Sequence, residues 1–173
     1  MRTTRTKPAG PDPAEAVAAE AVATLYQLHY PSLVRLAALL VPDPAMAEDI
    51  VQEAFAALHG EWPTLPGTDA ALARLRRSVV RRSRSASSLR PAAGTGVPGS
   101  AVMSVLRTLP VRQREVVVLR YFADLPEGEI AAATGLSAAA VRHHAVRAMS
   151  SLQDGLGPAG PDGEAQEIRR RSW

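Results

Sequence analysis

The sequence lacks cysteine and contains few aromatic residues. None of its 173 residues is cysteine, and phenylalanine, tyrosine and tryptophan together make up only 4%. The absence of cysteine excludes disulfide bonds, zinc sites with thiolate ligands and cysteine nucleophiles. Apolar runs fall far short of the roughly 20 residues of a membrane span, and the N-terminus, MRTTRTKPAGPDPAEA, lacks the apolar stretch of a signal peptide. We therefore expect a soluble, cytoplasmic protein without a membrane segment.

Alanine supplies much of the apolar content, with 32 residues in the chain. Because alanine buries little surface, this composition does not favour a single large core. Alanine is also the best helix former and a poor strand former. The composition therefore predicts an all-α fold of one or two small helical domains.

The net charge of +3 hides an uneven distribution of charged residues. Between Arg35 and Arg74 there are six acids and no basic residue, whereas Arg74–Arg90 holds seven arginines and no acid. An acidic surface next to a basic one indicates two different partners, one of them nucleic acid. Two solvated helix faces would carry the same charges.

Segments rich in proline, glycine and serine divide the chain into two modules. Residues 1–14 and 154–173 are polar and rich in helix breakers, which predicts disorder. Residues 91–100 (PAAGTGVPGS) have the composition of a flexible linker. We therefore predict a first helical module over residues 15–90 and a second over residues 101–153.

Helical spacing of apolar residues predicts three helices in the first module. They are expected at about 15–40, 44–59 and 70–89. Pro31 either kinks the first helix or begins a new turn. Asp43 and Pro44 have the residue types of an N-cap and a first helical position. Gly60 is expected to end the second helix.

The second module carries a helix-turn-helix pattern. Its predicted helices are at about 101–108, 110–122, 127–134 and 137–152. Gly135 supplies the positive φ of a tight turn, Leu136 fills that turn, and Ser137 caps the last helix. In helix-turn-helix proteins this last helix lies in the DNA major groove, but a plain helical hairpin would show the same spacing. Its expected outer face consists of Ala138, Ala139, Arg142, His143, Val146 and Arg147.

Two further motifs resemble those of a known family and occur in the same order as there. The run Pro44–Leu58 (PAMAEDIVQEAFAAL) resembles region 2.2 of the sigma-70 family in its extracytoplasmic-function (ECF) group. The run Leu106–Leu152 resembles region 4 and contains an LP-x-x-x-RE-V-x-LRYF element. The matching residues are Ala47, Glu48, Asp49, Val51, Gln52, Glu53 and Phe55 in the first run, and Leu109, Pro110, Arg114, Glu115, Val117, Leu119, Arg120, Tyr121 and Phe122 in the second.

The resemblance implies a promoter-specificity subunit that binds core RNA polymerase. In the family, region 2.2 binds the clamp helices of the largest polymerase subunit. This role falls here on Asp49, Gln52 and Glu53, with Ile50 and Phe55 beside or beneath them. The three polar residues share one helix face at spacing i, i+3, i+4. An acidic face with an amide can accept bidentate hydrogen bonds from arginine.

The resemblance also implies contacts with double-stranded and melted promoter DNA. The predicted helix at 70–89 resembles regions 2.3 and 2.4, which open and read the −10 element. The expected −10 contacts are Arg74, Arg77, Arg81 and Arg84, with Trp62 either stacking on a flipped base or belonging to the core. The expected −35 contacts are Ser137, Ala139, Arg142, His143 and Arg147.

Two positions depart from the family pattern. Many members have asparagine where Arg81 falls and an aromatic residue near Ala73. An additional arginine should strengthen nonspecific phosphate contact more than sequence reading. The scarcity of aromatic residues in this segment predicts weak intrinsic melting of DNA.

Enzymatic motifs are missing from the sequence. It contains no HExxH, no glycine-rich phosphate loop and no Ser/His/Asp grouping, so we expect no catalysis, no cofactor and no metal site. Two alternatives to a sigma factor stay open: a stand-alone helix-turn-helix regulator whose first module dimerises, and a sigma-like protein that binds polymerase without opening DNA. An anti-sigma factor would suit a protein with two DNA-binding modules, but no residue requires one.

Overall fold

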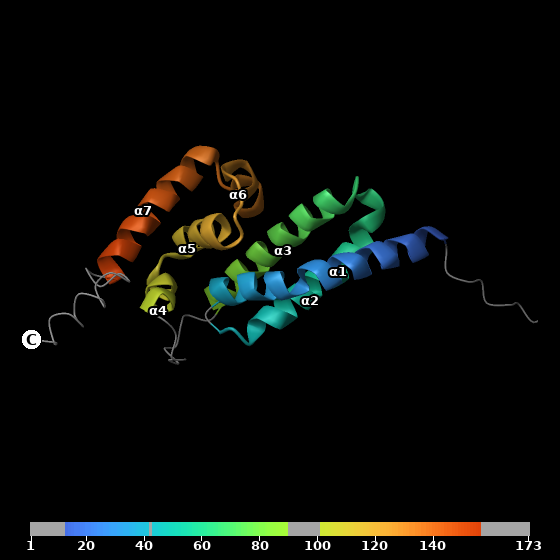
Figure 1. Cartoon of the computed structure of the whole chain (residues 1–173), viewed down its shortest axis with the longest axis horizontal. Coiled ribbons are helices and arrows are strands. Elements are labelled where there is room, and N and C mark those ends of the chain that lie inside the picture. The colour runs from blue at the N-terminus through green and yellow to red at the C-terminus, as the bar shows by residue number, and fades with distance from the viewer. Residues whose placement is uncertain (1–12, 42, 90–100, 157–173) are drawn as a thin grey trace, which may run out of the picture.

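The computed structural model describes residues 13–41, 43–89 and 101–156, and all regular structure in these ranges is helical, as predicted (Figure 1). The first module consists of α1 (Pro13–Leu40), α2 (Met46–Glu61), the 3-10 helix η1 (Trp62–Thr64) and α3 (Thr68–Leu89). The second module consists of α4 (Ala101–Thr108), α5 (Val111–Val117), the π-helix η2 (Val118–Phe122), α6 (Glu127–Thr134) and α7 (Ala138–Leu156). The predicted linker and most of both predicted terminal segments lie outside the described residues.

One face of α2 forms the centre of the first module. Every apolar residue on this face is buried: Ala47, Ile50, Val51, Ala54, Phe55 and Leu58. They belong to the same apolar cluster as Leu36 of α1 and Leu75 and Val79 of α3. Because α2 packs against both neighbouring helices, its opposite side, which carries the acidic residues, faces solvent.

The bounds of α2 differ from the prediction at both ends. The helix begins at Met46 rather than Pro44, because Asp43 caps a turn that precedes it: Asp43 Oδ1 accepts a hydrogen bond from the Ala45 backbone N–H at 3.0 Å. Gly60 does not end the helix, which stops one residue later where Pro63 lacks an N–H for the next helical hydrogen bond.

The turn between α6 and α7 has the predicted geometry. Gly135 has φ of 72°, and its backbone N–H donates to the Ala131 carbonyl at 2.9 Å. This left-handed conformation favours glycine. Ser137 Oγ accepts a hydrogen bond from the Ala140 backbone N–H at 3.2 Å, so Ser137 caps α7. Leu136 packs against the apolar cluster, as expected for the residue that fills the turn.

The helix predicted at 110–122 is not uniform. It begins as α5 and widens into the π-helix η2, where the Ala123 backbone N–H donates to the Val118 carbonyl at 3.1 Å, five residues back. A π turn accommodates one more residue than an α turn. Val118 and Leu119 stay buried through this change of winding, which sequence periodicity did not reveal.

The two modules pack against each other. Helix α3 lies beside α5 and α6, and α1 contacts η2 (Figure 1). Buried apolar side chains of both modules form one continuous cluster. The sequence predicts two modules on a linker but not this contact between them. Within the described ranges, no helix combines the length and the apolar character needed to cross a membrane.

Candidate protein and nucleic-acid interfaces

The expected polymerase-binding residues form an exposed ridge on α2. Asp49, Gln52 and Glu53 are all exposed, whereas Ile50 is 7% exposed and lies beneath them. We call the three exposed residues the acidic ridge. Beside the ridge, an open hollow of about 510 Å³ lies between α2 and α3 and is lined by Met46, Asp49, Ile50, Glu53, Arg81, Arg82, Ser85 and Ala86. The hollow offers apolar surface next to two carboxylates, which suits a protein partner.

Arg82 lies next to the acidic ridge and forms an ion pair with Glu53. The Glu53 side chain is nevertheless 63% exposed, so its carboxylate stays accessible to a partner. Sequence reasoning missed this contact, because the two residues lie on different helices and Arg82 is one of several arginines in a run. No local spacing signal could have identified it.

An aromatic cluster lies between α1 and α2. The rings of Tyr26 and Tyr30 stack with centroids 4.3 Å apart, and Phe55 contacts Tyr26 edge-on at 5.1 Å. Loss of hydration raises the pKa of Tyr26, and the neighbouring Tyr30 adds to the shift. In a chain with so few aromatic residues, these three rings join α1 to α2.

The four arginines expected to contact the −10 element do not share one environment. Arg77 and Arg81 are exposed on α3, and neither takes part in the ion pairs found among the described residues. Arg74 is bound to Glu61 at the end of α2, through Nε to Oε2 at 2.6 Å and Nη2 to Oε1 at 2.8 Å. This pair lowers the pKa of Glu61 and raises that of Arg74.

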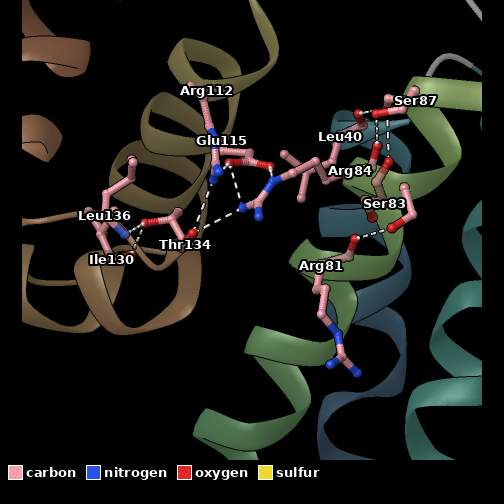
Figure 2. Close-up of polar contacts among 12 residues, drawn as sticks. Leu40, Arg81, Ser83, Arg84, Ser87, Arg112, Glu115, Ile130, Thr134 and Leu136 are labelled. Carbon is pink, nitrogen blue, oxygen red and sulfur yellow. Dashed lines mark hydrogen bonds and ion pairs between the residues drawn. The ribbon is translucent and has the colours of Figure 1, made fainter.

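Arg84 points toward the second module rather than to solvent. Its guanidinium binds both carboxylate oxygens of Glu115 and the Thr134 carbonyl (Figure 2). Together with Arg77 and Arg81 it lines an open groove of about 530 Å³ between α3 and the turn after α6. We call this the arginine groove. The structure therefore brings Arg77, Arg81 and Arg84 to one groove, whereas Arg74 is bound to Glu61 and lines a separate small pocket with Arg81.

Trp62 begins η1 and is half-buried. Its ring packs against the apolar cluster, and its carbonyl accepts a hydrogen bond from the Leu65 backbone N–H at 3.0 Å. Trp62 therefore contributes to the core while part of the residue stays open to solvent. The loop that follows contains Pro66 and Gly67 and leads directly into α3.

The outer face of α7 is exposed, as predicted. Each of its residues is open to solvent: Ala138, Ala139, Arg142, His143, Val146 and Arg147. Arg142 forms an ion pair with Glu127 at the start of α6, and Glu127 also lies 3.9 Å from Arg120. The Ser137 hydroxyl oxygen accepts the hydrogen bond that caps α7. A contact of this hydroxyl with DNA must therefore be compatible with that hydrogen bond.

Two family descriptions match this chain. Residues 25–88 match "Sigma-70 region 2", and residues 100–152 match "Sigma-70, region 4". The first match lies within the first module, and the second covers most of the second module. The RNA polymerase sigma-E factor of Streptomyces coelicolor is 33% identical over 156 residues, which are 81% of this chain and 88% of that protein. The sigma-E factor of Streptomyces avermitilis is 31% identical over 81% of this chain and 87% of that protein.

Solved structures show the same arrangement of helices. CnrH, in complex with the cytosolic domain of CnrY, has a TM-score of 0.65 and 27% identity, and the match covers 86% of this chain and all of CnrH. The sigma factor RpoE of Bartonella quintana, in complex with the anti-sigma factor NepR, has a TM-score of 0.63 at 18% identity and covers 80% of this chain, which supports the fold alone. The chain belongs to the sigma-70 family and is an ECF-type RNA polymerase sigma factor for transcription initiation, with regions 2 and 4.

Proposed function

We propose that this sigma factor binds core polymerase through the acidic ridge of α2, contacts the −10 element through α3 and reads the −35 element through the outer face of α7. The observation that carries the proposal is the exposure of the charged residues: Glu48, Asp49 and Glu53 of α2 face solvent, as do Arg77 and Arg81 of α3 and Arg142 and Arg147 of α7. A further exposed arginine, Arg35, lies on α1, and Arg81 also lines the hollow beside the acidic ridge. One chain can then bind a basic protein surface and DNA at the same time.

The acidic ridge suits a helix of the polymerase clamp that carries arginine. Asp49 and Glu53 lie one helical turn apart and present carboxylates that can each accept two hydrogen bonds from a guanidinium. Gln52 lies between them and can both donate and accept. The hollow beside the ridge would accommodate an apolar side chain of the same partner against Met46 and Ile50.

The exposed arginines suit DNA. Arg77 and Arg81 carry exposed guanidinium groups that can bind phosphates of the melted −10 strand, and such contacts are sensitive to salt. On α7, Arg142 and Arg147 lie on the face that a helix-turn-helix protein inserts into the major groove, where arginine can bind guanine edges or phosphates. His143 adds a weaker donor or acceptor on this face.

An inhibitory protein partner is part of the proposal. CnrH, which shares this fold at 27% identity, was solved with the cytosolic domain of CnrY bound. An anti-sigma factor for this chain would cover the surfaces needed for polymerase. Because both proposed ligands, core polymerase and the chromosome, reside in the cytoplasm, we place the active protein there.

Reconstituted transcription tests the proposal. Full-length protein is added to core polymerase from Streptomyces coelicolor on a library of promoter fragments, and run-off transcripts are mapped at their 5′ ends. We expect transcripts that begin downstream of a shared pair of elements. DNA binding at nanomolar affinity without core, and without any effect of core, would instead support a stand-alone regulator. Core binding without transcripts would support a sigma-like protein that does not open DNA.

A further inference from the structure

A buried carboxylate lies at the contact between the two modules. Glu115 of α5 is 2% exposed. Its Oε1 accepts a hydrogen bond from Arg84 Nε at 2.7 Å, and its Oε2 accepts from Arg84 Nη2 at 3.0 Å and from Arg112 Nη1 at 3.2 Å (Figure 2). Arg84 comes from α3 of the first module, and Arg112 lies one turn before Glu115 on α5. The carboxylate therefore joins an arginine from each module.

The end of α6 completes this cluster. The Thr134 carbonyl accepts hydrogen bonds from Arg84 Nη2 at 3.1 Å and from Arg112 Nη1 at 3.0 Å. Thr134 is the last residue of α6, where unpaired helix carbonyls carry partial negative charge. We call Arg84, Arg112, Glu115 and Thr134 the clasp. Within the clasp, every contact of Arg84 is made with the second module.

A second contact joins α3 to α6, nearer the start of α3 than the clasp. Arg76 Nη1 lies 3.2 Å from Glu129 Oε2 of α6. Beside this pair, Ala73 of α3 and Ala132 and Ala133 of α6 line a small space of about 40 Å³. The modules are thus joined at two points on α3, which fixes its orientation against α6.

We propose that the clasp is an autoinhibitory contact that keeps the free protein closed and withholds Arg84 from promoter DNA. This inference rests on the proposed function in one respect, namely that α3 contacts the −10 strand. In the closed form the guanidinium of Arg84 is bound by a carboxylate, and the arginine groove is bounded on one side by α6 and its turn. A DNA strand must displace the second module before it can follow all three arginines of the groove.

The clasp is built to open reversibly. When Arg84 leaves, Glu115 keeps Arg112 as a partner, so the carboxylate is not left buried without a counter-charge. Arg84 in turn exchanges a carboxylate for a DNA phosphate, which offers the same bidentate geometry. Binding of core polymerase and DNA can therefore shift the closed form to an open one by supplying a replacement ligand.

Energy transfer between two dyes tests the closed state without polymerase or DNA. The natural chain has no cysteine, so Ala23→Cys on α1 and Ser151→Cys on α7, both exposed positions, accept the dyes selectively. We expect high transfer in the parent protein and a clear loss of transfer in Arg84→Gln and in Glu115→Gln. Arg82→Gln is the matched control, because Arg82 lies on the same helix and pairs inside the first module.

Arg84→Gln decides the inference even where Glu115→Gln disturbs the folding of the second module. Transfer in Arg84→Gln equal to that of the parent would overturn the clasp. Equal losses of transfer in Arg84→Gln and Arg82→Gln would also overturn it, because the effect would then reflect the charge of α3 rather than the contact between modules.

A reversible crosslink tests the inhibition itself. The double variant Ala73→Cys/Ala132→Cys, which places one thiol on each side of the small space between α3 and α6, is joined by a reducible bifunctional maleimide. We expect the crosslinked protein to lose run-off transcription with core polymerase and the same preparation to regain it after reduction. Equal transcription before and after reduction would refute the inhibition. If the reduced protein also yields no transcript, the proposed function fails, and the dye measurement alone decides the clasp.

Discussion

Arg74 and Glu61 form a bidentate ion pair that joins the start of α3 to the end of α2, with Nε 2.6 Å from Oε2 and Nη2 2.8 Å from Oε1. The pair spans η1 and the loop that connects the two helices. An arginine bound in this way stabilises the first module and is less available to a DNA phosphate than its exposed neighbours.

The pair predicts a pH-dependent contribution to stability. Hydrogen bonding to Arg74 lowers the pKa of Glu61 in the folded protein. The stabilisation is therefore complete above the ordinary glutamate pKa of about 4.3 and is lost as pH falls through the lowered folded value. Glu61→Gln should lower the melting temperature at pH 7, and this difference should shrink in acid. Glu20→Gln, at an exposed position of α1, is the control and should change neither; a constant difference at all pH values would contradict the prediction.

The exposed arginines of α3 should matter more for DNA than Arg74. We expect Arg77→Ala and Arg81→Ala each to remove about one phosphate contact, which lowers the salt dependence of binding to single-stranded DNA by about 0.7 in log–log slope. Core polymerase loaded with each variant is titrated onto a forked −10 DNA fragment, and the binding affinity is measured at several salt concentrations. Arg74→Ala should change the slope less, and an equal change in all three would show that the ion pair with Glu61 opens on DNA.

Charge reversal on the acidic ridge should weaken polymerase binding. Replacing Asp49 and Glu53 together by arginine places like charges against a basic partner, and we expect a loss of about 2 kcal/mol or more, roughly thirtyfold in affinity. Fluorescence anisotropy with labelled protein and core polymerase measures it. Glu20→Arg, an exposed acid on α1 away from the ridge, is the matched control. Binding of isolated −35 duplex by the second module should be unchanged in the double variant, and unaltered core affinity would exclude the ridge as the binding surface.

Much of the local structure could be predicted from sequence because local signals determine it. The bounds of α4 and α6 agree with the prediction, since Pro110 follows the first and Gly135 the second. The buried stripe of α2 follows from helical periodicity alone. The cap of α7 depends on residues close in sequence, and Ser137 Oγ accepts a hydrogen bond from the Ala140 backbone N–H, as expected.

Contacts between distant segments could not be predicted in this way. Arg84 and Glu115 are separated by the linker, and nothing in either segment identifies the other as its partner. The pairing of Arg74 with Glu61 likewise depends on how η1 turns the chain between two helices. One signal was available: Arg112 and Glu115 lie at i, i+3 on a predicted helix. It would have identified a pair within α5 but not the first-module arginine that joins it.

Ser137 should affect DNA binding through the helix it caps. Removing its hydroxyl in Ser137→Ala leaves the Ala140 backbone N–H without its partner and should cost about 1 kcal/mol of unfolding free energy. Urea unfolding measures this cost, with Ser150→Ala on the exposed side of α7 as the control. Ser137→Asp also caps a helix, so it should retain stability while weakening binding to −35 duplex through repulsion of phosphate. Equal DNA affinity of Ser137→Asp and the parent would show that this end of α7 lies away from the phosphates.

Neutralising Glu127 should strengthen DNA binding rather than weaken it. Glu127 pairs with Arg142 on the outer face of α7 and lies close to Arg120, so its charge competes with DNA phosphates for both arginines. The pair is exposed, and exposed pairs contribute about 0.2–1 kcal/mol. Glu127→Gln should therefore raise affinity for −35 duplex by up to about fivefold, and the gain should fade at high salt as screening weakens both interactions.

The control is Glu129→Gln in an isolated second module. Glu129 lies two residues further along α6, and its partner Arg76 belongs to the first module, so this change breaks no ion pair in the isolated module. The double variant Glu127→Gln/Arg142→Ala should bind no more tightly than Arg142→Ala alone, because the released Arg142 supplies the additional affinity. A double variant that still binds more tightly than Arg142→Ala would assign the effect to Arg120 or to net charge.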